Sequence, residues 1–203
     1  MTTAMGRRER NNLERRANLL AAARRLFDAQ GFEETTVEQI AAEAELATRT
    51  VYNFFPAKVD LLAALLSKEI RERMPSSAVG EQDDHASAYE GLLALITPQI
   101  EIMAGLPKTE QKLVVARSLL TGPTSEASRY NAEIDVFIRE TITEFLAERS
   151  TRGALPPDVD PEVTAGLVFS MLNGLYLEWL QSDTDLQAVL PTVADYLRLI
   201  LRP

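Results

Sequence analysis

The stretch from residue 35 to residue 62, TTVEQIAAEAELATRTVYNFFPAKVDLL, constrains the fold of this chain more than any other part of it. Thr35 and Thr36 are each followed three residues later by Glu or Gln, so either threonine can open a helix with a capping box. Only three residues, 45–47, separate this helix from the next one, which we expect at about residues 48–55. Two helices joined so closely are typical of a helix-turn-helix.

The second helix of this pair has an apolar side and a polar side. Val51 and Phe55, four residues apart, would anchor it to the core, and alanines in the preceding helix allow the two helices to cross closely. The polar side would carry Thr48, Arg49, Thr50, Tyr52 and Asn53. Arg49 and Asn53 suit base reading, because arginine forms bidentate contacts with guanine and asparagine with adenine. The alternative is that these side chains only solvate a short helix.

A lysine stands at the start of the following helix, which we expect to run from Pro56 to Met74. A cation such as Lys58 in the first turn opposes the helix dipole by about 0.3 to 1 kcal/mol. A bound phosphate would remove that penalty. The alternative is a lysine that simply extends into water.

Helical periodicity continues along most of the chain, and no stretch shows the alternation of a half-buried strand. The sequence therefore predicts an all-α protein. The first helix should run from about residue 12 to residue 30 and end at Gly31. Further helices are expected at about residues 84–104, 108–121, 125–150, 161–182 and 186–201.

The polar segment PSSAVGEQDD marks the expected domain boundary. We predict a helix-turn-helix DNA-binding domain at residues 1–55, a connecting helix at 56–74, and a helical ligand-binding and dimerisation domain at 75–203. Charge supports the division: residues 1–74 carry 12 basic and 11 acidic groups, whereas the whole chain has a formal charge of -9. The positive charge is concentrated at the N-terminal end, as a nucleic-acid partner requires.

These residues resemble the N-terminal domain of TetR/AcrR-family transcriptional regulators. The motifs AA-x-x-LF-x-x-x-GF-x-x-TT, IA-x-x-A and T-V-Y-x-x-F-x-x-K-x-x-L occur at the family's spacing within about residues 13–66. The resemblance implies a homodimer with a three-helix DNA-binding domain on a larger all-α ligand-binding domain. It also implies phosphate contacts from Thr36, Tyr52 and Lys58, and base-proximal contacts from the helix start at Thr48, Arg49 and Thr50.

Two residues depart from the family pattern. Glu45 stands where the family often has glycine in the turn, and Ala47 stands where it often has a serine or threonine cap. We expect Glu45 to strain or re-aim the turn, and the cap to shift to Thr48.

Large side chains in the C-terminal part are candidates for an effector pocket: Met103, Phe137, Phe169, Asn173, Tyr176 and Trp179. The alternative is an ordinary helical core, in which the polar groups of the last three satisfy one another. Gly166, Ser170 and Gly174, spaced four apart, form a stripe of small residues that would let a second protomer's helix approach. The last helix would complete this dimer seam as a four-helix bundle through Leu186, Val189, Leu190, Val193, Tyr196, Leu197 and Ile200. The alternative is an intramolecular contact only.

Several function classes have little or no support in the composition. Cysteine is absent, which excludes disulfides and thiolate metal sites, and the single histidine, His85, supports neither a metal site nor a catalytic base. We therefore expect no catalytic residues, metal or cofactor. By sequence no apolar run approaches the roughly 18 to 20 residues needed to span a bilayer, so we expect a cytoplasmic protein without a membrane partner.

The sequence predicts a regulator, most simply a repressor, that binds a palindromic double-stranded DNA operator as a homodimer and is released by a small apolar or amphipathic effector. The alternative is an all-α small-molecule binding or interaction protein without operator specificity. The sequence identifies neither the effector, the operator nor the regulated genes.

Overall fold

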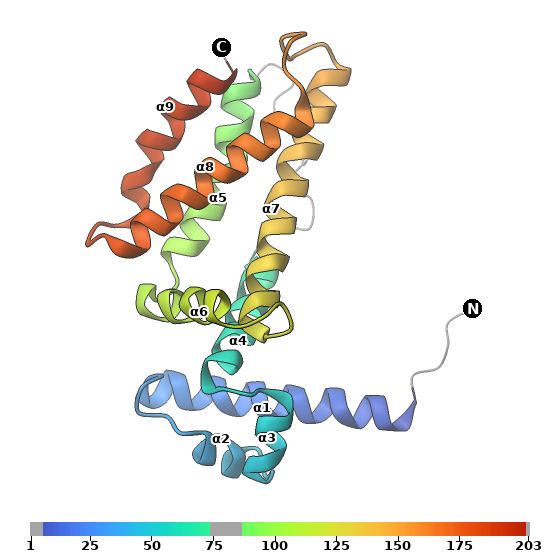
Figure 1. Cartoon of the computed structure of the whole chain (residues 1–203), viewed down its shortest axis with the longest axis vertical. Coiled ribbons are helices and arrows are strands. Elements are labelled where there is room, and N and C mark those ends of the chain that lie inside the picture. The colour runs from blue at the N-terminus through green and yellow to red at the C-terminus, as the bar shows by residue number, and fades with distance from the viewer. Residues whose placement is uncertain (1–5, 74–86, 202–203) are drawn as a thin grey trace. The chain divides into compact units, whose positions relative to one another are not determined.

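The computed structural model describes residues 6–73 and 87–201. Within these residues the chain forms nine α-helices and one short 3₁₀ helix, and no strand, which confirms the predicted all-α class (Figure 1). The helices are α1 (Arg7–Gln30), α2 (Val37–Glu43), α3 (Thr48–Phe54), α4 (Lys58–Arg73), α5 (Ala88–Ala104), α6 (Lys108–Leu120), α7 (Glu126–Thr151), α8 (Pro161–Gln181), η1 (Leu186–Val189) and α9 (Leu190–Leu201).

The chain folds into two compact units. The first contains the described residues up to 68 together with 113–130, and the second contains the described parts of 69–112 and 131–203. The first unit therefore includes the end of α6 and the start of α7, which our predicted division assigned to the C-terminal domain. That division remains a prediction. The expected boundary segment PSSAVGEQDD and His85 lie outside the described residues.

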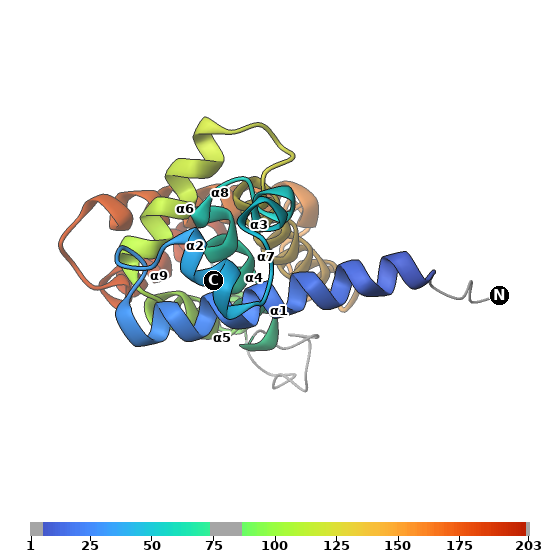
Figure 2. The ribbon, with the colours of Figure 1, turned by 90° about the horizontal axis from the view of Figure 1, so that it is seen from below.

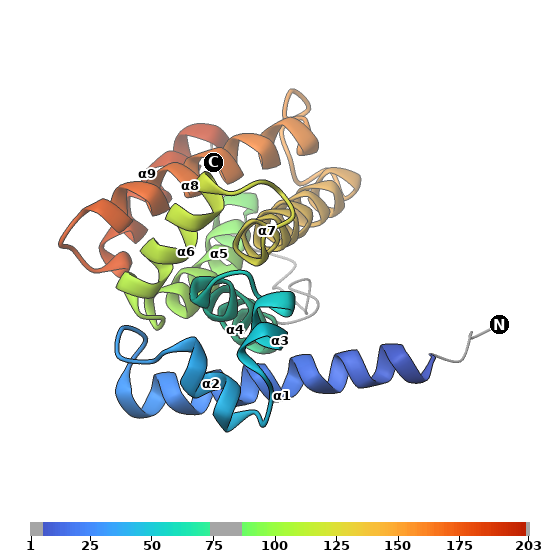
Figure 3. The ribbon, with the colours of Figure 1, turned by 60° about the horizontal axis from the view of Figure 1, so that its bottom comes forward.

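In the first unit, α2 and α3 lie across the C-terminal half of α1, as two turned views show (Figures 2 and 3). The helix α1 begins at Arg7, earlier than the predicted residue 12, and ends at Gly31, whose φ of 85° requires the freedom of glycine. The core of this unit is formed by side chains from all four of its N-terminal helices: Leu19, Ala22, Ala23, Phe27, Ile40, Ala41, Val51, Leu61, Leu62 and Leu65.

The second unit packs α5 against η1 and α9, and α8 against the same two elements. Its core contains Leu92, Ile96, Ile142, Leu146, Val168 and Leu197. Packing between α5 and α7 is close at Gly91, where a Cβ atom would lie 2.6 Å from the Phe145 ring. A side chain at this position would therefore require the Phe145 ring to move.

One helix corrects our expectation about bilayer-spanning segments. The length and composition of α8, Pro161–Gln181, would allow it to cross a membrane, although a third of the apolar window (33%) is buried inside the protein. A single helix of this kind is weak evidence for a membrane protein, because core helices have the same composition. The apolar outward side of α8 instead becomes relevant to self-association below.

Candidate DNA-binding site

The start of α2 is fixed by a capping box on Thr36. The Thr36 hydroxyl accepts a hydrogen bond from the Gln39 backbone N–H at 3.2 Å, and the Gln39 side chain accepts one from the Thr36 N–H at 2.8 Å. Of the two registers that the sequence allowed, the structure therefore uses the Thr36 register. Thr35 is buried and donates its hydroxyl to the Gly31 carbonyl at 2.7 Å, which ties the turn to the end of α1.

The turn after α2 closes with two backbone hydrogen bonds. The N–H of Leu46 donates to the Ala41 carbonyl at 2.8 Å, and the N–H of Glu45 donates to the Ala42 carbonyl at 3.1 Å. This is the Schellman arrangement, which places the residue after the helix in the left-handed region. Here that residue is Glu45, with a φ of 54°. The predicted strain at Glu45 therefore has a geometric basis: a glutamate occupies a conformation that favours glycine.

The helix α3 begins without a side-chain cap. Its N-cap residue is Ala47, and no side chain accepts a hydrogen bond there. Our expectation that Thr48 would be the cap is wrong, because Thr48 is already the first helical residue. The Schellman turn delivers the chain to Ala47 in an extended conformation, one residue before the threonine.

The two sides of α3 are arranged as predicted. Val51 is 0% exposed and Phe55, directly after the helix, is 1% exposed, so both anchor α3 to the core. On the other side, three of the predicted DNA-contacting side chains are exposed and two are half-buried: Arg49, Tyr52 and Asn53, then Thr48 and Thr50. Within the described residues, none of these five side chains forms a hydrogen bond or ion pair. Their polar groups are available to an external partner.

Lys58 differs from the free cation that we expected at a phosphate. Its ammonium donates to the carbonyls of Phe32, Glu33 and Thr35 at 2.7, 3.1 and 2.9 Å, and lies 4.2 Å from the centre of the Phe32 ring. These carbonyls belong to the α1–α2 connection. Lys58 therefore holds the segment that leads into Thr36, and a direct contact between its ammonium and phosphate remains a prediction that this geometry does not favour.

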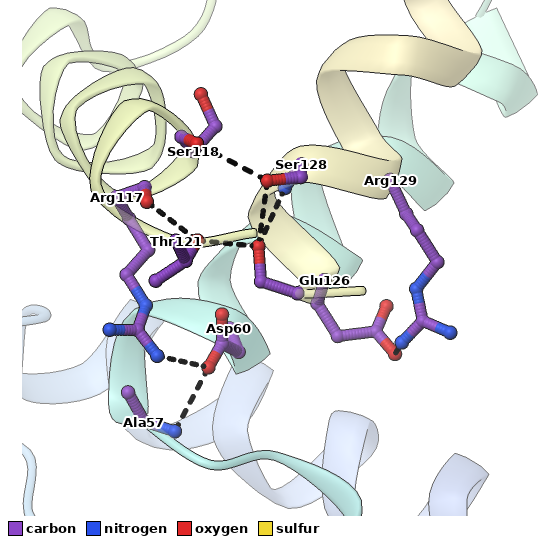
Figure 4. A network of polar contacts seen from close by, with 9 residues as sticks. Ala57, Asp60, Arg117, Ser118, Thr121, Glu126, Ser128 and Arg129 are labelled. Atoms are coloured by element: carbon purple, nitrogen blue, oxygen red, sulfur yellow. Dashed lines mark hydrogen bonds and ion pairs between the residues drawn. The ribbon is translucent and has the colours of Figure 1, made fainter. Parts of the chain in front are cut away.

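A buried polar network lies at the start of α4 (Figure 4). The Asp60 carboxylate accepts hydrogen bonds from the Ala57 N–H at 3.0 Å and from Arg117 Nη2 at 3.2 Å. Asp60 thereby caps α4, and it is fully buried, whereas the Arg117 side chain is 29% exposed. Arg117 lies on α6, far away in the sequence, so sequence reasoning did not detect this pair. The only local signal was an aspartate in the first turn of α4.

The comparison with known protein families bears directly on this geometry. The family described as "Bacterial regulatory proteins, tetR family" matches residues 19–65, which include α2, α3, the Glu45 turn and Lys58. The N-terminal domain of the chain is that of a TetR-family transcriptional regulator. The match confirms the resemblance found in the sequence and the N-terminal helix-turn-helix domain.

Curated relatives extend the similarity over most of the chain. It is 26% identical over 170 residues to the HTH-type transcriptional regulator TtgR of Pseudomonas putida, covering 82% of this chain and 80% of that protein. It is also 27% identical to the HTH-type transcriptional regulator BetI of Burkholderia thailandensis, covering 93% of this chain and 94% of the relative.

Among solved structures, the transcriptional regulator FadR of Bacillus subtilis, crystallised with stearoyl-CoA, has the same fold. The TM-score is 0.57 at 22% sequence identity, covering 89% of this chain and 96% of FadR. The similarity in fold therefore includes the second unit, whose sequence is less characteristic than that of the first.

In the second unit, the predicted effector residues Tyr176 and Trp179 pack together with ring centres 5.8 Å apart. The Tyr176 hydroxyl donates to Gln111 Oε1 at 2.9 Å, and the indole N–H of Trp179 donates to the Thr184 carbonyl at 3.0 Å. Burial raises the pKa of the Tyr176 phenol above its usual value. Both polar groups are thus satisfied within the protein, but by Gln111 and Thr184 and not by one another, as the sequence alternative had it.

Sequence reasoning missed two residues that organise this region. Gln111 is buried, and its amide donates to the carbonyls of Met103 and Leu106 at 2.9 and 3.0 Å while it accepts from Tyr176. Lys108 donates to the Ser182 carbonyl at 2.6 Å and lies 4.5 Å from the Trp179 ring. A glutamine and a lysine early in an exposed-looking helix gave no sequence signal for these contacts.

The other predicted effector residues are placed unevenly. Phe169 is buried, with the Arg139 guanidinium 4.7 Å from its ring, and Met103 and Phe137 are half-buried. Asn173 is exposed, so its amide is not enclosed in the way the predicted pocket required. A pocket that contains these residues remains a prediction, and Asn173 is its weakest member.

Proposed function

We propose that this TetR-family protein is a repressor that binds a palindromic operator as a homodimer and is released by a small apolar or amphipathic effector. The observation that carries the proposal is α3. Its inner side is anchored by Val51 and Phe55, while its exposed polar side chains have no partner within the described residues. A helix held rigidly from behind, with uncommitted polar groups in front, suits insertion into a major groove.

Within this interface we assign Arg49 and Asn53 to base edges. They are four residues apart and share the exposed side of α3. Thr48 and Thr50 would contact bases or phosphates near the start of the helix, and Tyr52 a phosphate. Thr36 would reach the backbone from the start of α2, with Lys58 acting through the loop that it holds.

The outward side of α8 supports a dimer. Val163, Leu167 and Leu177 are large apolar residues that are exposed along this helix, with Leu167 at 55%. A Cβ atom at Gly166 or Gly174 would meet nothing within 4 Å, so both glycines face open space. On α9, Tyr196 and Leu199 are also exposed. We propose that a second copy of the chain covers the outward side of α8, because two α3 helices held one DNA turn apart would contact twice as many base pairs as one.

Part of the predicted dimer seam must be revised. We expected Leu186, Val193 and Leu197 to face the partner, but all three are buried within their own unit. They pack where α9 and η1 contact α5. The contribution of α9 to the dimer is therefore restricted to its exposed residues.

For the effector we propose an apolar or amphipathic molecule bound in the second unit, among Met103, Phe137, Phe169, Tyr176 and Trp179. The structure of FadR from Bacillus subtilis was obtained with stearoyl-CoA, and it shares this fold. Ligand binding would favour a dimer geometry that no longer fits two successive grooves. We further propose a cytoplasmic location and no catalytic role.

Selection of fragments from a genomic library, followed by binding measurements at several salt concentrations, tests the proposal. The operator should be bound at least about a thousandfold more tightly than random DNA. Arg49→Ala should relax base preference at one position of each half-site, whereas Arg129→Ala, an exposed arginine on α7, should not. Equal affinity for operator and random DNA would contradict the proposal and favour a binding protein without operator specificity.

The effector arm of the experiment uses stearoyl-CoA and coenzyme A alone as probes. Release of the operator by the first but not by the second would support an apolar effector. If neither probe changes operator binding or thermal stability, an acyl chain is excluded as the effector.

A further inference from the structure

The first turns of α1 form an arm that projects beyond the core of the first unit. The family match begins at residue 19, and Leu19 is also the first fully buried residue of the helix. The helix nevertheless begins at Arg7, and Arg16 is the only half-buried side chain between residues 7 and 18. Figure 2 shows this part of α1 extending sideways past α3 within the same unit. We call residues 7–18 the arm.

The arm is basic and its cations are uncommitted. It carries Arg7, Arg8, Arg10, Arg15 and Arg16 against Glu9 and Glu14. Arg16 is engaged with Glu126 at 3.0 Å. The other four arginines are exposed, and within the described residues they make no hydrogen bond or ion pair. Nothing in the fold of the first unit uses their charge.

The position of α2 identifies the side of the arm that continues the helix-turn-helix face. Arg25, further along α1, forms an ion pair with Glu43 on α2 at 2.8 Å, so α2 lies on the Arg25 side of α1. Steps of three, four or seven residues follow one side of a helix. Counting back from Arg25 in such steps gives one stripe along the arm: Asn18, Arg15, Asn11 and Arg7.

We propose that the arm binds the phosphate backbone of the duplex that flanks each operator half-site. The proposal rests on the proposed DNA-binding function and adds a second contact region outside the helix-turn-helix. Arginine and asparagine side chains are both common donors to phosphate. The stripe from Arg7 to Asn18 is about 16 Å long at 1.5 Å per residue, which spans about five phosphates of one strand.

The positive charge of the arm favours DNA as its binding partner. The arm carries exposed arginines with few acidic neighbours and belongs to the same compact unit as α3. Next to a bound operator, the surface with the highest density of negative charge is the DNA backbone. The contact would carry no base information. It would lengthen the bound site and strengthen its salt dependence, without altering which operator sequence is preferred.

The test compares R7Q/R15Q with K112Q/R152Q, a control that removes the same charge. Lys112 and Arg152 are exposed cations of the second unit. Both variants alter exposed side chains only, and unchanged helicity and Tm would verify their folding. Affinity is measured on a duplex that contains only the operator and on one extended by about five base pairs at each end.

For the wild type and for K112Q/R152Q, we expect the extended duplex to bind on the order of tenfold more tightly than the short one. For R7Q/R15Q that gain should disappear. The slope of log affinity against log salt on the extended duplex should flatten by about 3.6 for a dimer that loses four phosphate contacts. The preferred operator sequence should not change.

Two results would overturn the proposal and are distinct from failure of the proposed function. One is an equal gain from the extended duplex in R7Q/R15Q and wild type. The other is an equal loss in both variants, which would show a general effect of charge. Failure of the proposed function would instead be seen in the wild type, as the absence of any operator preference on either duplex.

Discussion

Arg117 Nη2 lies 3.2 Å from the Asp60 carboxylate, and this ion pair joins α6 to the start of α4, the helix that follows α3. Asp60 is fully buried and also caps α4 through the Ala57 N–H. Two atoms of the pair, Asp60 Oδ1 and Arg117 Nε, are buried without a hydrogen-bond partner in the described part of the chain. The pair is therefore held by few contacts, and each partner depends on the other for compensation of its charge.

The first prediction concerns this pair. Arg117→Met should lower the free energy of unfolding by about 2 to 3 kcal/mol, because it leaves the Asp60 charge buried without a counterion. Asp60→Asn/Arg117→Met should recover most of that loss, since the asparagine carbonyl can still cap α4 while the charge is removed. Urea unfolding of Arg117→Met, of Asp60→Asn and of the double variant measures the coupling energy between the two residues. Additive effects would show that the pair contributes nothing as a pair.

Substitution of Lys58 distinguishes a role in holding the α1–α2 connection from a direct contact with phosphate. Lys58→Met should lower stability by about 1 to 3 kcal/mol, because three carbonyls of the α1–α2 connection lose a charged donor. Operator affinity should fall because the start of α2 is no longer held, but the salt slope should stay the same. A direct phosphate contact would instead flatten the slope by about 0.9 per protomer. Titration of operator binding at several salt concentrations distinguishes the two.

Glu45→Gly should raise the free energy of unfolding by about 1 kcal/mol, since glycine adopts a φ of 54° without a steric penalty. Glu45→Ala is the matched control, because it removes the charge but keeps the Cβ atom. It should bring no such gain. If both variants stabilise the protein equally, the charge of Glu45 is the cause and the backbone conformation is not.

Stability should depend on pH through Asp135 on α7. Burial raises the pKa of this carboxyl above 3.8, and the nearby Arg139 lowers it in part. Ionisation is therefore less favourable in the folded protein, and Asp135 destabilises the fold as the pH rises from 3.8 through the raised value. Asp135→Asn should increase the Tm at pH 7, and the increase should shrink as the pH falls toward 3.8. Asp183→Asn, an exposed position, serves as the control.

Leu167→Glu should weaken the proposed dimer. Leu167 is 55% exposed on the outward side of α8, so a charge there costs the single chain little but would be buried in an α8 interface. Sedimentation should show a shift toward monomer, with weaker operator binding and an unchanged helix content. Leu119→Glu, at an 80% exposed position at the end of α6, is the control. Dimers of equal stability in both variants would exclude this side of α8 as the interface.

The helices were largely predictable because their signals are local. Gly31 ends α1 as expected, and Thr36, one of the two candidate caps, opens α2. The burial of Val51 and Phe55 was predictable, because apolar residues four apart lie on one side of a helix. Helix starts were less accurate: Thr48 does not cap α3, since the preceding turn determines where the chain enters the helix.

Side-chain partners far apart in the sequence could not be predicted. A lysine in a first helical turn suggested an external anion, yet Lys58 binds carbonyls from residues 32–35. Asp60 and Arg117, or Gln111 and Tyr176, are brought together only when separate helices pack. Periodicity specifies which side of a helix is buried, but not which polar groups will meet across the buried surface.

The open space around Gly166 and Gly174 has a consequence for how sequence variation would be tolerated. A Cβ atom at either position meets nothing within 4 Å among the residues that the structure describes, so a mutational scan scored on folding or abundance should accept many residues there. The same scan scored on repression should reject the larger ones, if a second α8 approaches at these glycines. A difference between the two scores, confined to one side of one helix, would locate the partner without a structure of the assembly.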